Sequence, residues 1–189
     1  MIRLHIFDVD GTLLDSMPLW ENLGRNYLKA HGGTIPGDLD ERLETLTIDE
    51  SARWFHEELG IRETPAQIQR GFLDMIRKGY EEEVPAMPGA EARLKMAAAS
   101  GAPLVVLSTS DEGLIKAAFK RLGFLKYFSQ IYTSGRLGLG KDGPGIFRAV
   151  CDLEDVEPAE AMVYEDSDFA IRAAREAGCQ VTVIGQAEG

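Results

Sequence analysis

The segment FDVDGT places two carboxylic acids, Asp8 and Asp10, at the end of the apolar run LHIF. Side chains alternate along an extended chain, so both acids project from the same face. Two carboxylates that close repel each other and raise each other's pKa unless a cation lies between them. The spacing therefore favours a counter-ion here, and the alternative is a polar turn exposed to water.

Two later apolar runs also end in polar side chains. PLVVL is followed by Ser108 and Thr109, and AMVY is followed by Glu165 and Asp166. Ligands of open α/β sheets bind at the carboxyl ends of the strands, so these side chains are expected to join the two acids of the first run in one crevice. Four carboxylates in one crevice require a hard divalent cation. Mg²⁺ suits such a site because it takes oxygen ligands and keeps waters that a phosphate can replace.

A candidate phosphate-binding group accompanies these acids. Lys141, in the glycine-rich stretch SGRLGLGKDGPG, can neutralise a phosphate oxygen, although its position also allows an ordinary surface lysine. Ser108 and the backbone N–H groups that follow it, including that of Thr109, offer hydrogen-bond donors to an anion. The alternative for both hydroxyl residues is turn and helix-capping chemistry.

Short, β-rich apolar runs predict strands that are buried on both faces of a parallel sheet. The five predicted strands are 4–7, 103–107, 130–133, 161–164 and 180–185. Helical periodicity follows two of them, over 111–124 and 167–178. Strands that alternate with helices predict a doubly wound α/β core with a Rossmann-like parallel sheet.

The chain between the first and second strands departs from this alternation. It is helical in pattern, without a convincing strand, and it ends in the proline-containing connector VPAMPG. We therefore predict an all-helical cap domain of residues 16–85 inserted into a core domain of residues 1–15 and 86–189.

Composition limits the class of partner. The chain has 189 residues, 44% of them hydrophobic and 27% charged, and its net charge of −11 argues against nucleic acid and anionic membranes. Neither a signal peptide nor an apolar stretch of transmembrane length is evident. Cys151 and Cys179 lack metal or redox spacing and fit a reducing compartment. We expect a cytoplasmic protein that binds a small phosphorylated metabolite and is a monomer, with a dimer left open.

In chain order, FDVDGT, LVVLSTS, the lysine of GKDGPGIF and MVYEDSDFAIRAAREAG resemble the four motifs of the haloacid dehalogenase superfamily. The resemblance spans essentially the whole chain. It is to the phosphatase and phosphomutase branch, whose members carry a helical cap after the first motif. It implies a Mg²⁺-dependent phosphatase of a sugar phosphate or similar phosphomonoester.

The same resemblance implies roles for individual residues. Asp8 would be the nucleophile that forms an aspartyl-phosphate, and Asp10 the general acid and then base. Ser108, Thr109 and Lys141 would bind the phosphoryl group. The metal ligands would be Asp8, Asp10 through its backbone carbonyl, and Asp166, with Glu165 a further ligand or an acid behind them.

Two alternatives are left open. In a β-phosphoglucomutase-type phosphomutase, relatives carry a histidine where this chain has Trp20 and commonly a valine where it has Thr12, so both positions favour a phosphatase. The other alternative is a non-enzymatic protein. A phospho-receiver would be shorter and would lack the helical insertion, and a protein kept only for binding is disfavoured because every motif acid and the lysine are intact. Ser16 and Trp20 are candidates for the substrate side, although the spacing of Trp20 also fits a side chain of the cap core.

Overall fold

The structure, a computed structural model, describes residues 1–185 of the chain. The chain divides into two compact units. Unit 1 consists of Met1–Ser16 and the chain from Val84 onward, and unit 2 is Met17–Glu83. Within residues 1–185, no helix combines the length and apolar character needed to cross a membrane.

Unit 1 contains a sheet of five parallel strands in the order β3-β2-β1-β4-β5. The strands are β1 Leu4–Phe7, β2 Leu104–Ser108, β3 Gln130–Thr133, β4 Ala161–Glu165 and β5 Gln180–Val183. The order places β1 at the centre, between β2 and β4, so the ends of these three strands are neighbours. The predicted doubly wound α/β core is confirmed.

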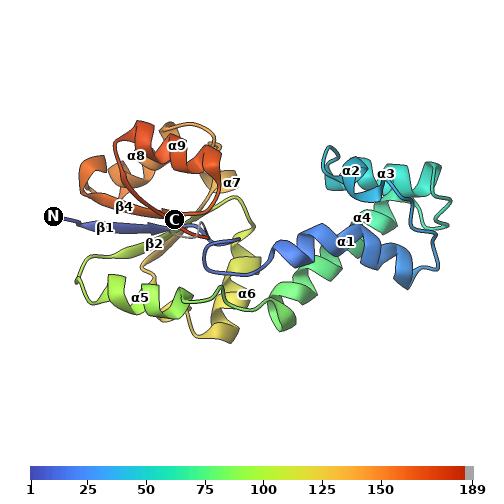
Figure 1. Cartoon of the computed structure of the whole chain (residues 1–189), viewed down its shortest axis with the longest axis horizontal. Helices are drawn as coiled ribbons and strands as arrows, with labels where there is room; N and C mark the ends of the chain where they lie inside the picture. The colour runs from blue at the N-terminus through green and yellow to red at the C-terminus, as the bar shows by residue number, and fades with distance from the viewer. Residues whose placement is uncertain (186–189) are drawn as a thin grey trace. The chain divides into compact units, whose positions relative to one another are not determined.

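Helices cover both faces of this sheet (Figure 1). Helices α5 (Ala90–Ala98) and α6 (Glu112–Leu122) lie on one face, and α8 (Gly145–Leu153) and α9 (Asp168–Ala177) on the other. Three short elements complete the unit, namely α7 (Ser134–Leu137) and 3₁₀ turns at Leu125–Tyr127 and Pro158–Glu160. Helix α8 was not predicted from the sequence.

Strand β1 is buried on both faces because successive side chains enter different halves of the core. Leu4 and Ile6 belong to the apolar cluster that includes Phe147 of α8. Phe7 instead packs edge-on against Phe128 and stacks on Tyr164 of the neighbouring strand. This burial fixes the strand whose end carries Asp8.

Unit 2 is all-helical. Its elements are α1 Met17–Ala30, α2 Leu39–Leu43, α3 Ile48–Glu57, α4 Pro65–Lys78 and a π-helical turn Gly79–Glu83. Local sequence sets the helix starts: Thr47 and Thr64 each form a capping box, with Glu50 and Gln67 respectively. Tyr27 meets the edge of Phe72 in the centre of the unit.

Two segments of unit 1 lead into and out of unit 2, and they pair with each other. Leu14 and Ala86 form an antiparallel bridge, and the N–H of Asp15 donates to the Pro85 carbonyl at 3.0 Å. Arg121 of α6 donates a hydrogen bond to the carbonyl of Val84. Both crossings of the chain are therefore held by hydrogen bonds within the sheet-containing unit.

Candidate active site

The sheet order brings the acids of β1 and β4 together. β1 and β4 are neighbours with Phe7 opposite Tyr164, and the N–H of Asp8 donates to the Tyr164 carbonyl at 3.0 Å. Asp8 therefore follows β1 at the level where Glu165 ends β4. Since both strands run parallel, their carboxyl ends form one edge, as expected for a ligand site in this fold.

A buried lysine lies between these two acids. The Nζ of Lys141 donates to Oδ1 of Asp8 at 2.7 Å, to Oε2 of Glu165, and to the carbonyl of Leu107 at 3.2 Å. Lys141 is 4% exposed and both acids are buried. All three donors of the ammonium group are thus used, and Lys141 is a buried cation of this edge rather than a surface lysine.

The electrostatics of this trio favour a charged lysine. Burial alone works against its charge, but the two carboxylates outweigh burial and raise the pKa of Lys141. Asp8 behaves differently. Burial raises the pKa of its carboxyl to about 7, although Lys141 opposes the rise, and the charge of Glu165 adds to it. Two carboxylates and one ammonium leave a net negative charge in a buried place, which an additional cation would neutralise.

One oxygen of Asp8 has no hydrogen bond to any described residue. Oδ2 is buried and finds no hydrogen-bond partner within residues 1–185, while Oδ1 accepts from Lys141. A buried carboxylate oxygen without a partner is costly unless a ligand or ion completes it. Binding of a phosphorus atom or a metal ion at this oxygen would therefore remove an unfavourable buried, unpaired charge.

Asp166 completes a potential metal site. One carboxylate oxygen from each of Asp8, Glu165 and Asp166 lies within 4.8 Å of the others. Hard divalent cations bind such oxygen sets. The hydroxyl of Thr12 donates to Oδ1 of Asp166 at 3.2 Å, and burial, followed by the charge of Glu165, raises the pKa of Asp166. The residues present therefore fit a divalent cation.

Glu165 is the member of this cluster with most of its hydrogen-bonding capacity in use. Its Oε1 accepts from the N–H groups of Asp166 and Ser167, both at 3.2 Å, and from the Ser167 hydroxyl at 2.9 Å. Its Oε2 accepts from Lys141. Glu165 therefore holds Lys141 and the start of α9 in place, whereas fewer hydrogen bonds to described residues occupy the carboxylates of Asp8 and Asp166.

Asp10 is held by two serines. Ser16 donates to Oδ1 and Ser110 donates to Oδ2, each at 2.6 Å. Ser16, one of the two predicted substrate-side residues, is fully buried, and its hydroxyl is used by Asp10. Ser110 was not singled out from the sequence. Its only signal was its position after a strand end, which it shares with Thr109.

The end of β2 contributes one buried hydroxyl. The N–H of Ser110 donates to Oγ of Ser108 at 3.0 Å, and Ser108 is 1% exposed. Thr109 is exposed, with no side-chain hydrogen bond within the described range. Thus Ser108 organises the turn after β2, and a contribution from Thr109 to anion binding would come from its backbone.

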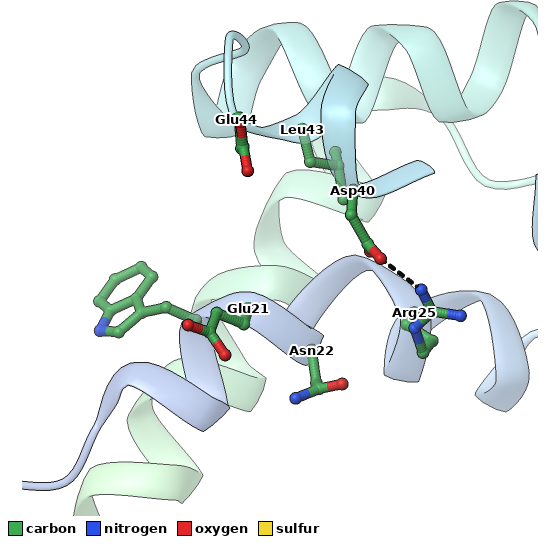
Figure 2. A pocket seen from close by; sticks show the side chains of 7 residues that line it. Glu21, Asn22, Arg25, Asp40, Leu43 and Glu44 are labelled. Atoms are coloured by element: carbon green, nitrogen blue, oxygen red, sulfur yellow. Dashed lines mark hydrogen bonds and ion pairs between the residues drawn. The ribbon is translucent and has the colours of Figure 1, made fainter. Parts of the chain in front are cut away.

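Trp20, the other predicted substrate-side residue, lies in unit 2 on α1. It is partly exposed, and its Nε1 donates to the Tyr80 hydroxyl at 3.1 Å. It also lines a cavity of about 490 Å³ between α1 and α2 (Figure 2). The other lining residues are Glu21, Asn22, Arg25, Asp40, Leu43 and Glu44.

The charge of this cavity argues against a phosphate there. Figure 2 shows that the one cationic lining residue, Arg25, is already paired, with Nη2 2.6 Å from Oδ2 of Asp40. Glu21 and Glu44 add two further negative charges. The cavity of unit 2 is therefore polar and acidic. The buried cation that could bind a phosphate, Lys141, lies instead at the sheet edge of unit 1.

Known proteins resemble this chain over nearly its whole length. A phosphorylated carbohydrates phosphatase of Thermotoga maritima is 25% identical over 175 residues, covering 93% of this chain and 81% of the relative. A phosphoglycolate phosphatase of Neisseria gonorrhoeae is 30% identical over 196 residues, covering 94% and 78%. A solved Thermotoga maritima structure, provisionally named a β-phosphoglucomutase, shares the fold with a TM-score of 0.87 at 23% identity. That match covers 100% of this chain and 88% of the other.

The family assignment agrees with the site. The family model for haloacid dehalogenase-like hydrolases matches residues 2–178, a range that contains Asp8, Asp10, Lys141 and Asp166. With the parallel sheet and the acids gathered at its edge, this match makes the chain a member of the haloacid dehalogenase-like hydrolase family.

Proposed function

We propose that this protein is a Mg²⁺-dependent phosphatase of a small phosphomonoester, with Asp8 as nucleophile. The observation that carries the proposal is the Asp8 carboxylate itself. One of its oxygens is held by Lys141 and the other is buried without a hydrogen-bond partner in the described chain. A carboxylate oriented in this way is ready to form a bond to phosphorus.

The reaction has two steps. First, an oxygen of Asp8 bonds to phosphorus, the bond to the ester oxygen of the substrate breaks, and Asp10 gives its proton to the departing alkoxide. Second, Asp10 takes a proton from a water whose oxygen bonds to phosphorus. The bond between phosphorus and Asp8 then breaks, and inorganic phosphate leaves. Ser16 and Ser110 support both steps by holding the two oxygens of Asp10 in one orientation.

Lys141, with Ser108 and the backbone N–H of Thr109, would bind the phosphoryl group. Because all three Nζ donors of Lys141 are used, binding requires one of them to leave a carboxylate or carbonyl for a phosphoryl oxygen. The exchange keeps the ammonium satisfied and moves positive charge towards the group being transferred, which is where phosphoryl transfer needs it.

Asp8, Asp166 and the backbone carbonyl of Asp10 would hold Mg²⁺, with Glu165 behind them. When bound, the ion supplies positive charge that neutralises the phosphoryl oxygens. The net negative charge left by two carboxylates and one ammonium supports this assignment.

The substrate class we propose is a sugar phosphate or a similar phosphorylated metabolite. The support is the named substrate of the Thermotoga maritima relative, phosphorylated carbohydrates. A phosphomutase would use the same two acids. Trp20 disfavours a phosphomutase, because it stands where the relatives of that branch carry a histidine, and its indole N–H donates to Tyr80.

We further propose that residues 16–85 act as a cap on a core of residues 1–15 and 86–189, excluding water during the reaction. We expect the protein to be a cytoplasmic monomer. Its two free, buried thiols, Cys151 and Cys179, are consistent with a reducing compartment.

The test is release of inorganic phosphate from a generic aryl phosphate and from a panel of sugar phosphates, with and without Mg²⁺. Asp8→Asn and chelation should each abolish turnover. The matched control, Asp74→Asn on the exposed surface of α4, should retain it. Turnover by Asp8→Asn, or turnover in the presence of a chelator, would refute the proposal. Appearance of phosphate on another carbon of the sugar, with none in solution, would favour the mutase.

A further inference from the structure

An arginine occupies an unusual place on α5. The buried face of this helix carries Ala90, Leu94 and Ala97, and Arg93 lies beside that stripe. Its Nε is buried, without a hydrogen-bond partner among the residues described. Burying an unpaired N–H costs free energy that an apolar side chain at this position would not cost. The hydrogen bonds that the guanidinium makes are therefore the place to look for its role.

Arg93 reaches two backbone carbonyls, one 81 residues away in sequence and one five residues before it. Nη2 donates to the carbonyl of Thr12 at 3.1 Å, and Nη1 donates to the carbonyl of Pro88 at 3.2 Å. Thr12 is fully buried in the turn that follows β1, where the carbonyl of Val9 accepts the N–H of Thr12. Arg93 therefore ties the turn of the first motif to the segment that returns from unit 2.

That turn determines the orientation of the Asp166 carboxylate. The Thr12 hydroxyl donates to Oδ1 of Asp166 at 3.2 Å. On the other side, a Cβ on Gly11 would lie 2.1 Å from Oδ2 of Asp166, so the glycine backbone is packed directly against the carboxylate. With φ of +88°, Gly11 also has a backbone conformation that other residues rarely adopt. A shift of residues 11–12 would therefore move or rotate Asp166.

We propose that Arg93 is a positioning residue for the metal site. By holding the Thr12 carbonyl, its guanidinium fixes the turn whose hydroxyl and glycine orient Asp166. Arg93 itself touches neither substrate nor ion in this role. The inference rests on the proposed function in one respect, that Asp166 binds Mg²⁺.

The experiment is calorimetric titration of MgCl₂ into metal-free protein, which reads metal binding without turnover. Groups that orient metal ligands typically change affinity 10- to 100-fold when removed. We expect Thr12→Val to weaken the Mg²⁺ Kd by at least about tenfold and Arg93→Met by about tenfold. The matched control is Arg148→Met. Arg148 lies on α8 and also donates to a backbone carbonyl, that of Glu176 on α9, at 3.0 Å. Its Kd should stay within about twofold of wild type.

A double mutant separates a positioning role from general loosening of the fold. If Arg93 acts through Thr12, Thr12→Val combined with Arg93→Met should weaken binding by less than the product of the two single effects. Where Arg93→Met does not fold, Arg93→Gln, which keeps one amide donor, takes its place under the same criterion.

Three results would overturn the inference: an Arg93 variant with an unchanged Kd, an equal loss in Arg148→Met, or single effects that multiply fully in the double mutant. If wild type bound no Mg²⁺ at all, the proposed function would fail together with this inference. If wild type and Arg93→Met bound equally well, only the inference would fail.

Discussion

Exposed ion pairs within one helix occur in both units, but among the described residues the buried ion pairs between distant segments belong to unit 1. In unit 1, Lys141 is 4% exposed and pairs with Asp8, 133 residues away in sequence, and with Glu165, 24 residues away. In unit 2, Arg53 pairs with Asp49 one helical turn away at 2.8 Å, and their side chains are 53% and 58% exposed. Buried pairs between distant segments depend on the whole fold, whereas exposed pairs within a helix form wherever the helix forms. Charge that can do chemistry is therefore concentrated in unit 1.

The largest expected effect is that of Lys141→Met. It leaves two buried carboxylates without their ammonium partner, so we expect the free energy of unfolding to fall by about 3–5 kcal/mol at pH 7. The loss should be smaller at pH 5, where Asp8, whose pKa burial raises to about 7, can take up a proton. Urea denaturation at the two pH values measures it. Arg53→Met is the matched control in unit 2 and should change stability little, because exposed pairs contribute little. Equal losses in the two variants would remove the contrast between the units.

Asp10→Asn tests the chemistry of the site with little change in shape. We expect kcat for phosphate release to fall by about 10²- to 10⁴-fold, because an amide can neither give a proton to the leaving group nor take one from water. The melting temperature should change little, since an amide oxygen can still accept from one of the two serines. A kcat within tenfold of wild type would refute the proposed acid–base role.

Asp8 predicts a pH dependence of stability in the metal-free protein. Its folded pKa of about 7 exceeds the ordinary value of 3.8, so the folded state holds this proton more tightly. The stabilising contribution is fully present below about pH 4, declines as pH rises, and is lost above about pH 7. The amide introduced by Asp8→Asn does not titrate, so the melting temperature of this variant should rise relative to wild type between pH 4 and 7.5. Parallel curves for the two proteins, measured in chelator, would contradict the prediction.

The smallest effect belongs to the local interactions of unit 2. Thr64→Ala removes the side chain that caps α4 and should cost about 1 kcal/mol. Hydrogen exchange should locate the loss in α4, with kcat for phosphate release unchanged. Thr45→Ala is the control, because it removes an exposed hydroxyl that donates to the Arg42 carbonyl at the end of α2 and leaves the cap of α4 intact. Faster exchange throughout unit 1 in Thr64→Ala would contradict the prediction, because the loss would then not be confined to α4.

The sequence by itself predicted the α/β alternation and the helical insertion, because both depend on local periodicity and on turn residues. It also predicted that Asp8, Glu165 and Asp166 would gather, and their carboxylates do lie together. Each follows a buried strand, and the ends of parallel strands must meet at one edge of a sheet. The roles of these residues in catalysis and metal binding are still predictions.

Only the tertiary structure decided which partners those acids have. From the sequence, Lys141 could also be an ordinary surface lysine. In the structure it is buried between Asp8 and Glu165. The serines on Asp10 and the link from Arg93 to the turn at Thr12 depend on contacts between segments up to 100 residues apart. Periodicity and strand order place a backbone to within a turn, but a hydrogen bond needs its donor and acceptor within a few tenths of an ångström. Only packing of the complete unit fixes side chains that closely.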